Sequence, residues 1–299
     1  MFSWFILLFA LLQGLLEWLP VSSQGQTVTL IIALFPDISS FALSLAIWLH
    51  LGTMIAVIIK FRHEIFQYIN IKNKNPEIVQ WRRFLIFSTL GTIVTGVPCY
   101  FLVSYLIETD STYGEWVMLV IGIALIITAI FLFYSERKNR QIVVKGGVEE
   151  SEEKNTEISI GRKIEDLSLL KMATSGLFQG FSIIPGISRS GITMSGLLLM
   201  SVKKEDAIKG SFLMSIPAVL GGFLIDIVDT AVSGGDYIPP EVEWWVLLIA
   251  IVVTAVIGYL TMELFLYVAK KFNFSVICLI LGILTIVLFA VRFAGSGSV

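Results

Sequence analysis

Two charged residues lie inside stretches that are otherwise apolar. Glu17 falls in the N-terminal apolar stretch, and Arg189 falls in a second one further along the chain. A charge at the centre of a bilayer costs roughly 2.5–3.5 kcal/mol on insertion scales, so such residues are usually paired or functional. Charged residues near the ends of apolar stretches, such as Glu263 and Arg292, can reach an interface instead. Glu17 and Arg189 are therefore the first candidates for chemistry.

Small and hydroxyl-bearing residues surround both charges, namely Ser22, Ser23, Gly25, Ser188, Ser190 and Gly191. Each group interrupts an apolar stretch, so each break begins a new half-helix whose free N–H groups and positive dipole favour an anion. A guanidinium combined with hydroxyls and helix N-termini is suited to bind phosphate. A phosphate pocket bounded by lipid in turn indicates a substrate with a lipid tail and a phosphate head.

Candidate metal ligands are few. Gln13 and Glu17 stand four residues apart, so they share one face of a helix and can direct oxygens at a metal ion or a water molecule. Cys99 and Cys278 both lie in apolar stretches, which favours packing roles over a disulfide or a metal cluster.

The composition places these residues in a membrane protein. Of 299 residues, 56% are hydrophobic and 15% are charged, whereas about a quarter of a typical soluble domain is charged. This excludes a cytosolic globular protein, a disordered chain and a basic nucleic-acid binder. Six stretches suit bilayer-spanning helices of roughly 20 residues: residues 41–59, 84–107, 116–134, 210–227, 244–267 and 275–291.

Basic residues are unevenly distributed among the loops. They cluster in residues 60–83, 137–171, 203–209 and 270–271, whereas 108–115 and 226–243 contain carboxylates and no Lys or Arg. The positive-inside rule predicts that the basic segments are cytoplasmic and the acidic ones external. With this orientation the two broken stretches, residues 2–36 and 171–202, each enter and leave on one side of the membrane or cross it twice.

The two halves of the chain are related by sequence. Equivalent residues stand 166 positions apart: Gln13 and Gln179, Ser22 and Ser188, Gly25 and Gly191, Thr27 and Thr193. Because each half has three full spans, an odd number, the second copy is inverted relative to the first. We predict an all-α polytopic membrane protein with an inverted-topology repeat, in which each half is one re-entrant helical hairpin plus three transmembrane helices.

This prediction divides the chain into a first repeat at residues 1–134, a charged cytoplasmic linker at 135–170 and a second repeat at 171–299. The mixed charge of the linker favours solvated chain over a docking arm. Opposed hairpins would bring their tips together near the membrane midplane, with Glu17 and Arg189 in one cavity. The alternative role for these charges is an ion pair that locks the hairpins together.

Two motifs resemble those of a known family. The segment QGLLEWLPVSSQG, residues 13–25, resembles the first signature of the undecaprenyl-pyrophosphate phosphatase (bacitracin-resistance protein) family, and PGISRSG, residues 185–191, resembles the second. LHLGT at 49–53 and FLMSIP at 212–217 are also similar to the family. The resemblance covers nearly the whole chain outside the charged linker.

The resemblance implies an integral membrane phosphatase that hydrolyses a polyprenyl diphosphate, with a divalent cation (Mg²⁺ or Ca²⁺), and so recycles the lipid carrier for cell-envelope glycans. It implies a plasma-membrane site that opens to the outer face, and it is compatible with a homodimer. The implied catalytic residues are Glu17, which is also the implied metal ligand, Ser23 and Arg189. The implied substrate-binding residues are Gln13, Ser22, Gln26, Ser188, Ser190 and Gly191.

One residue departs from the family pattern. The family usually has a histidine where this chain has Gln26, and a glutamine cannot donate or accept a proton near neutral pH. Either Glu17 activates Ser23 or a metal-bound water without the histidine, or this member is impaired or altered in substrate. His50 is a candidate for a compensating group, although a lone histidine on an apolar helix is more often a packing residue.

A polyprenyl-phosphate flippase is the rival function, because inverted repeats, broken helices and a midplane anion site are also features of transporters. A membrane scaffold would explain neither Arg189 nor the paired serine turns.

Overall fold

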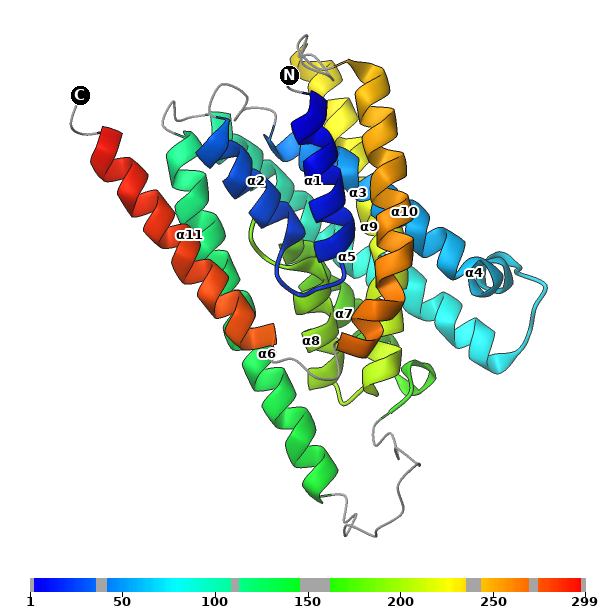
Figure 1. Ribbon diagram of the computed structural model, residues 1–299. Coiled ribbons are helices and arrows are strands. Elements are labelled where there is room, and N and C mark those ends of the chain that lie inside the picture. Colours follow the sequence, from blue (N-terminus) through cyan, green and yellow to red (C-terminus); the bar gives the residue numbers. More distant parts are fainter. Residues whose placement is uncertain are drawn as a thin grey trace.

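The computed structural model describes residues 3–35, 42–108, 113–145, 162–234, 243–268 and 274–296. These residues are almost entirely helical (Figure 1). Their only bridge of β type is an isolated one between Arg162 and Val202. The predicted external residues 109–112 and 235–242, and the acidic centre of the linker at 149–153, lie outside the described residues.

Both broken stretches form pairs of short helices. In the first, α1 (Ser3–Leu16) is followed by α2 (Ser23–Leu34), and in the second, α7 (Leu169–Gly180) is followed by a 3₁₀ turn and α8 (Arg189–Leu199). The polar residues between the helices end one and cap the next, so neither stretch continues as a single long helix.

The remaining helices are longer. They are α3 (Ala42–Lys60), α4 (Arg62–Ile69), α5 (Pro76–Glu108), α6 (Tyr113–Lys145), α9 (Lys204–Ser233), α10 (Trp244–Val268) and α11 (Phe274–Ser296). Five of them, α5, α6, α9, α10 and α11, are long and apolar enough to cross a membrane, and α3 with α4 makes a sixth candidate bent by 81°. The chain is therefore a polytopic helical membrane protein. Several helices extend beyond the predicted stretches: α5 begins at Pro76 and α9 at Lys204, while α6 continues to Lys145 and α11 to Ser296.

The predicted linker at 135–170 is only partly solvated. Its first part is the end of α6, and near its other end Ile164 and Leu167 are buried in a hydrophobic core. The Ile164 N–H also donates to Asp206 Oδ2 at the start of α9. Apolar residues three positions apart near the end of the linker, rather than its overall charge, account for this packing.

The short helices lie between long ones. The α1 helix packs on α10 and the α7 helix packs on α5, while α6 pairs with α11 and α3 with both α9 and α10 (Figure 1). Trp18 is fully buried, stacks edge-on against Phe212 and donates to the Gly258 carbonyl at 2.9 Å. This packing holds the chain directly after α1, which carries Glu17, against α9 and α10.

Candidate functional site

A cavity of about 320 Å³ lies between the two breaks. Its wall includes Glu17 and Ser23 from the first break and Arg189 from the second, together with residues of α3, α5 and α9. Polar groups that are far apart in the sequence therefore share one space.

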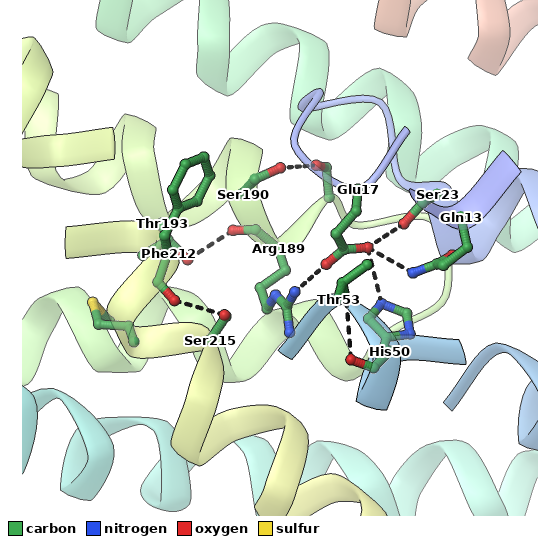
Figure 2. A network of polar contacts seen from close by, with 12 residues as sticks. Gln13, Glu17, Ser23, His50, Thr53, Arg189, Ser190, Thr193, Phe212 and Ser215 are labelled. Atoms are coloured by element: carbon green, nitrogen blue, oxygen red, sulfur yellow. Dashed lines mark hydrogen bonds and ion pairs between the residues drawn. The ribbon is translucent and has the colours of Figure 1, made fainter. Parts of the chain in front are cut away.

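Glu17 is the centre of a hydrogen-bond network (Figure 2). Its side chain is buried, and its Oε2 accepts from Gln13 Nε2 at 2.7 Å and from Ser23 Oγ at 2.6 Å. Arg189 Nη2 forms an ion pair with Oε1, and His50 Nε2 lies 3.4 Å from Oε2. The carboxylate at the first break is thus neutralised by the guanidinium at the second.

The first break positions Ser23 through a serine cap. Ser22 has a left-handed backbone (φ 56°), and its Oγ accepts the Gly25 N–H at 3.2 Å. This bond satisfies one of the free donors at the start of α2. Ser23 is consequently the first residue of α2, with its hydroxyl directed at Glu17 (Figure 2).

The second break uses a different turn to reach a similar cap. Gly186 has φ 98°, and a Cβ atom there would lie 2.6 Å from the Ile121 carbonyl oxygen, so only glycine fits. Ser188 Oγ accepts the Gly191 N–H at 3.2 Å, and Arg189 is the first residue of α8. Both helices thus begin at the cavity with a capping serine followed by a site residue.

A further contact ties the breaks together. Ser190 Oγ donates to the Leu19 carbonyl at 3.2 Å (Figure 2). With the Glu17–Arg189 ion pair, the two tips are joined by both a backbone contact and a charge contact.

Of the residues predicted for the site, six line the cavity: Glu17, Ser22, Ser23, Ser188, Arg189 and Ser190. Three others, Gln13, Gln26 and Gly191, are not part of its lining. Gln13 is fully buried behind Glu17, with an Oε1 that has no partner among the described residues. The Nε2 of Gln26 is likewise buried without a partner there.

Sequence reasoning missed several residues of the cavity wall. Asp226 and Asp229 of α9 line it, and Tyr100 of α5 donates to Asp229 Oδ2 at 3.0 Å. The sequence places both carboxylates at the edge of an acidic loop, but α9 continues beyond them to Ser233. Their spacing of three residues, which puts them on one helix face, was the available signal.

The described residues form no group of three or more His, Cys, Asp or Glu that could hold a metal ion. A cation here would accordingly depend on oxygens from elsewhere. Gln13 Oε1 has no partner among the described residues, but the amide turns its Nε2, and not this oxygen, to Glu17.

The fold and the site define a class: a helical, polytopic membrane protein with a charged, hydroxyl-lined cavity between two broken helical segments. Residues 6–284 match the family model described as bacitracin resistance protein BacA, and this chain belongs to that family.

Curated relatives match nearly the whole chain. An undecaprenyl-diphosphatase of Methanothrix thermoacetophila is 35% identical, over 93% of this chain and 94% of the relative. Relatives of the same name from Methanococcoides burtonii (34% identical; 94% and 96% covered) and Methanopyrus kandleri (32%; 93% and 93%) are similar over the same extent.

Proposed function

We propose that this protein is an integral membrane phosphatase that hydrolyses an undecaprenyl-type diphosphate to the monophosphate and inorganic phosphate. In this role it recycles the lipid carrier for cell-envelope glycan synthesis. The names of the relatives support the reaction. The observation that carries the proposal is the contact of Glu17 with both Ser23 and Arg189 in one cavity.

The site can bind the diphosphate electrostatically. Arg189 offers a guanidinium, and α2 and α8 both begin at the cavity, so their free N–H groups and dipoles favour an anion. When the substrate enters, its terminal phosphate takes over the contact of Arg189 with Glu17. These donors then stabilise the charge that develops on the phosphoryl oxygens.

Hydrolysis requires a nucleophile and a proton acceptor, and the first break supplies both. Ser23 Oγ, or a water molecule in its place, attacks the terminal phosphorus and passes its proton toward Glu17 Oε2, 2.6 Å from the hydroxyl. The bond from phosphorus to the bridging oxygen breaks, and the lipid monophosphate leaves. If Ser23 is the nucleophile, water then hydrolyses the phosphoserine.

Glu17 is the residue that would hold a divalent cation. Mg²⁺ is commonly bound by one or two carboxylates plus substrate phosphates, which fits this incomplete set of ligands. Such an ion would neutralise charge on the diphosphate.

The architecture proposed for this function is an inverted repeat of residues 1–134 and 171–299 with two re-entrant hairpins. One observation supports it: the first short helix of each half packs on a long helix of the other half. Gly14 of α1 approaches α10 closely, and its equivalent Gly180 of α7 approaches α5. The distribution of basic loops supports an opening of the cavity toward the outer face, because Asp226 and Asp229 of its lining belong to the predicted external segment 226–243.

Phosphate release by the purified protein tests the function. The wild type, with Mg²⁺ or Ca²⁺, should release phosphate from a C55 polyprenyl diphosphate. Arg189→Ala should lower kcat/KM by about 10²–10³-fold, the usual effect of removing one transition-state donor. Arg83→Ala, at an exposed arginine of α5, is the matched control.

Absence of phosphate release from the wild type, or an Arg189→Ala variant as active as the Arg83→Ala control, would contradict the proposal. Sided proteoliposomes loaded with labelled polyprenyl phosphate separate it from a flippase, because a phosphatase does not transfer the lipid monophosphate between leaflets.

A further inference from the structure

The α4 helix and the turn that joins it to α5 carry an exposed surface that has no role in the mechanism above. Both project sideways from the helix bundle in Figure 1. The chain bends by 81° between α3 and α4. A helix bent by this angle from one that crosses the bilayer runs nearly parallel to the bilayer surface.

Charged side chains place this bend at the edge of the membrane. Lys60, the last residue of α3, forms an ion pair with Glu263 of α10. Its ammonium group also lies over the ring of Tyr259, 5.8 Å from the centroid. Lysine and tyrosine side chains of this kind are typical of the boundary between lipid and water. Because α4 begins two residues after Lys60, it lies at the level of the lipid head groups.

One side of α4 packs on the protein. Tyr68 is buried and stacks on Trp81 of α5, with 5.8 Å between the ring centroids and an interplanar angle of 13°. Ile65, three residues before Tyr68, packs against the same core. These contacts fix the rotation of the helix about its axis, and they decide which side chains point away from the protein.

The two remaining sides of α4 differ in polarity. Phe66 and Ile69, three residues apart, are apolar, and 73% and 70% of their surface is exposed. Glu64 and Gln67 are also three residues apart and form a polar side. Each polar residue is two positions from one of the apolar residues, about 200° around the helix. An exposed apolar side opposite a polar side is typical of a helix that lies in a membrane interface.

The turn after α4 extends the apolar side. Ile71 is 81% exposed, and hydrogen bonds hold the backbone around it. Arg82 donates to the carbonyls of Tyr68 at 2.8 Å and Asn70 at 2.7 Å, and Asn70 Oδ1 accepts the Lys72 N–H at 3.1 Å. The turn therefore presents an apolar side chain outward from a fixed backbone.

The charge of this region is positive. Residues 60–83 contain six basic and two acidic residues. Of the two acids, Glu64 lies 3.8 Å from Lys209 of α9, and Glu77 is in the first turn of α5, where the helix dipole favours a carboxylate. Lys72 and Lys74 are exposed on the turn, beside Ile71. Their ammonium groups are therefore available to an anionic partner.

We propose that these residues form a binding surface for anionic phospholipid, which we call the α4 surface: Phe66, Ile69, Ile71, Lys72 and Lys74. The three apolar side chains insert at the boundary of the acyl chains, and the two lysines contact the phosphate groups of the lipid. The bend at the membrane edge favours lipid as the partner, because lipid already surrounds the helix from which α4 continues. This inference does not depend on the hydrolase function.

Spin labels on the two sides of α4 test the proposal. A nitroxide is attached through Phe66→Cys or Ile71→Cys, with Gln67→Cys on the polar side as the matched control. The background is Cys99→Ser, and Cys278 stays because it is buried. The protein is reconstituted in vesicles of phosphatidylcholine, with or without phosphatidylglycerol. Labels at 66 and 71 should be more accessible to oxygen, which partitions into lipid, than to a water-soluble nickel chelate. The label at 67 should show the reverse.

The lysines should add a dependence on the lipid head group. Phosphatidylglycerol should raise the ratio of lipid-embedded to water-exposed label at position 71. Lys72→Gln and Lys74→Gln should each lower that ratio about fivefold in these vesicles, which corresponds to about 1 kcal/mol for each lysine. Neither should change it in phosphatidylcholine alone. Lys163→Gln, at an exposed lysine outside the α4 surface, should leave the ratio unchanged in both.

Three results would overturn the proposal. Labels at 66 and 71 that are as accessible to the nickel chelate as the label at 67 would show that the surface faces water. Labels protected from both reagents would show that protein, such as a second copy of this chain, covers it. Insertion to the same extent in both kinds of vesicle would exclude binding of anionic lipid. Because no measurement involves turnover, each of these results leaves the hydrolase proposal intact.

Discussion

The two breaks share a frame and differ in chemistry. In both, a serine caps the new helix by accepting the N–H of a glycine three residues later, Gly25 in the first break and Gly191 in the second. At the first helical position, which the 166-residue spacing makes equivalent, the first break has Ser23 and the second has Arg189.

By our proposal, this difference lets the two breaks supply two halves of one reaction. In that proposal the first break contributes the hydroxyl of Ser23 and, through Glu17, a proton acceptor. The second contributes a cation that binds the same carboxylate in the absence of substrate and, by our proposal, phosphate in its presence. Each helix N-terminus favours an anion, and by our proposal the two breaks together combine a nucleophile with a counter-charge.

The largest expected effect is on Ser23. Ser23→Ala removes the hydroxyl that contacts Glu17 and should lower kcat on the order of a thousandfold, as the loss of a covalent nucleophile does. Phosphate release by purified protein measures the effect, with Ser195→Ala as control, because the buried Ser195 hydroxyl has no partner among the described residues. A fall in kcat of less than about tenfold would identify water as the nucleophile.

Substitution of the capping serines should have a smaller effect, and it should change the stability of the protein rather than the chemical step. Ser188→Ala leaves the Gly191 N–H without its acceptor and should lower the free energy of unfolding by about 1 kcal/mol. Ser22→Gly loses the equivalent bond but relieves the left-handed backbone at φ 56°, so its loss should be smaller. Thermal unfolding in detergent measures both changes, and equal losses would contradict this account of the two turns.

The smallest expected effect is at Gln26. Because this side chain is not part of the cavity lining, Gln26→His should change kcat far less than the about hundredfold contribution of a positioned general base. The same phosphate-release assay measures it. An about hundredfold rise in kcat would instead show that residue 26 takes part in the reaction.

Much of the fold was predictable from apolar length. A stretch such as residues 244–267 must be a helix in lipid, because no water is available there to satisfy its backbone groups. Helix ends were less predictable: α9 begins at Lys204 and contains Pro217, and neither its charged first turn nor the proline marks a boundary by itself. The burial of Ile164 in the linker was also not predictable, since charge dominates the composition around it.

The sequence by itself determined which charges had to be accounted for. Glu17 and Arg189 stand out because a charge in an apolar stretch needs a partner or a task, and the serine–glycine spacings mark two helix starts. Only the tertiary structure decided their contacts: that Ser23 and Arg189 reach the same carboxylate, and that His50 and Asp226 share the cavity while Gln26 does not line it. These residues lie on different helices, and the packing of helices far apart in the chain, not local spacing, sets which side chains meet.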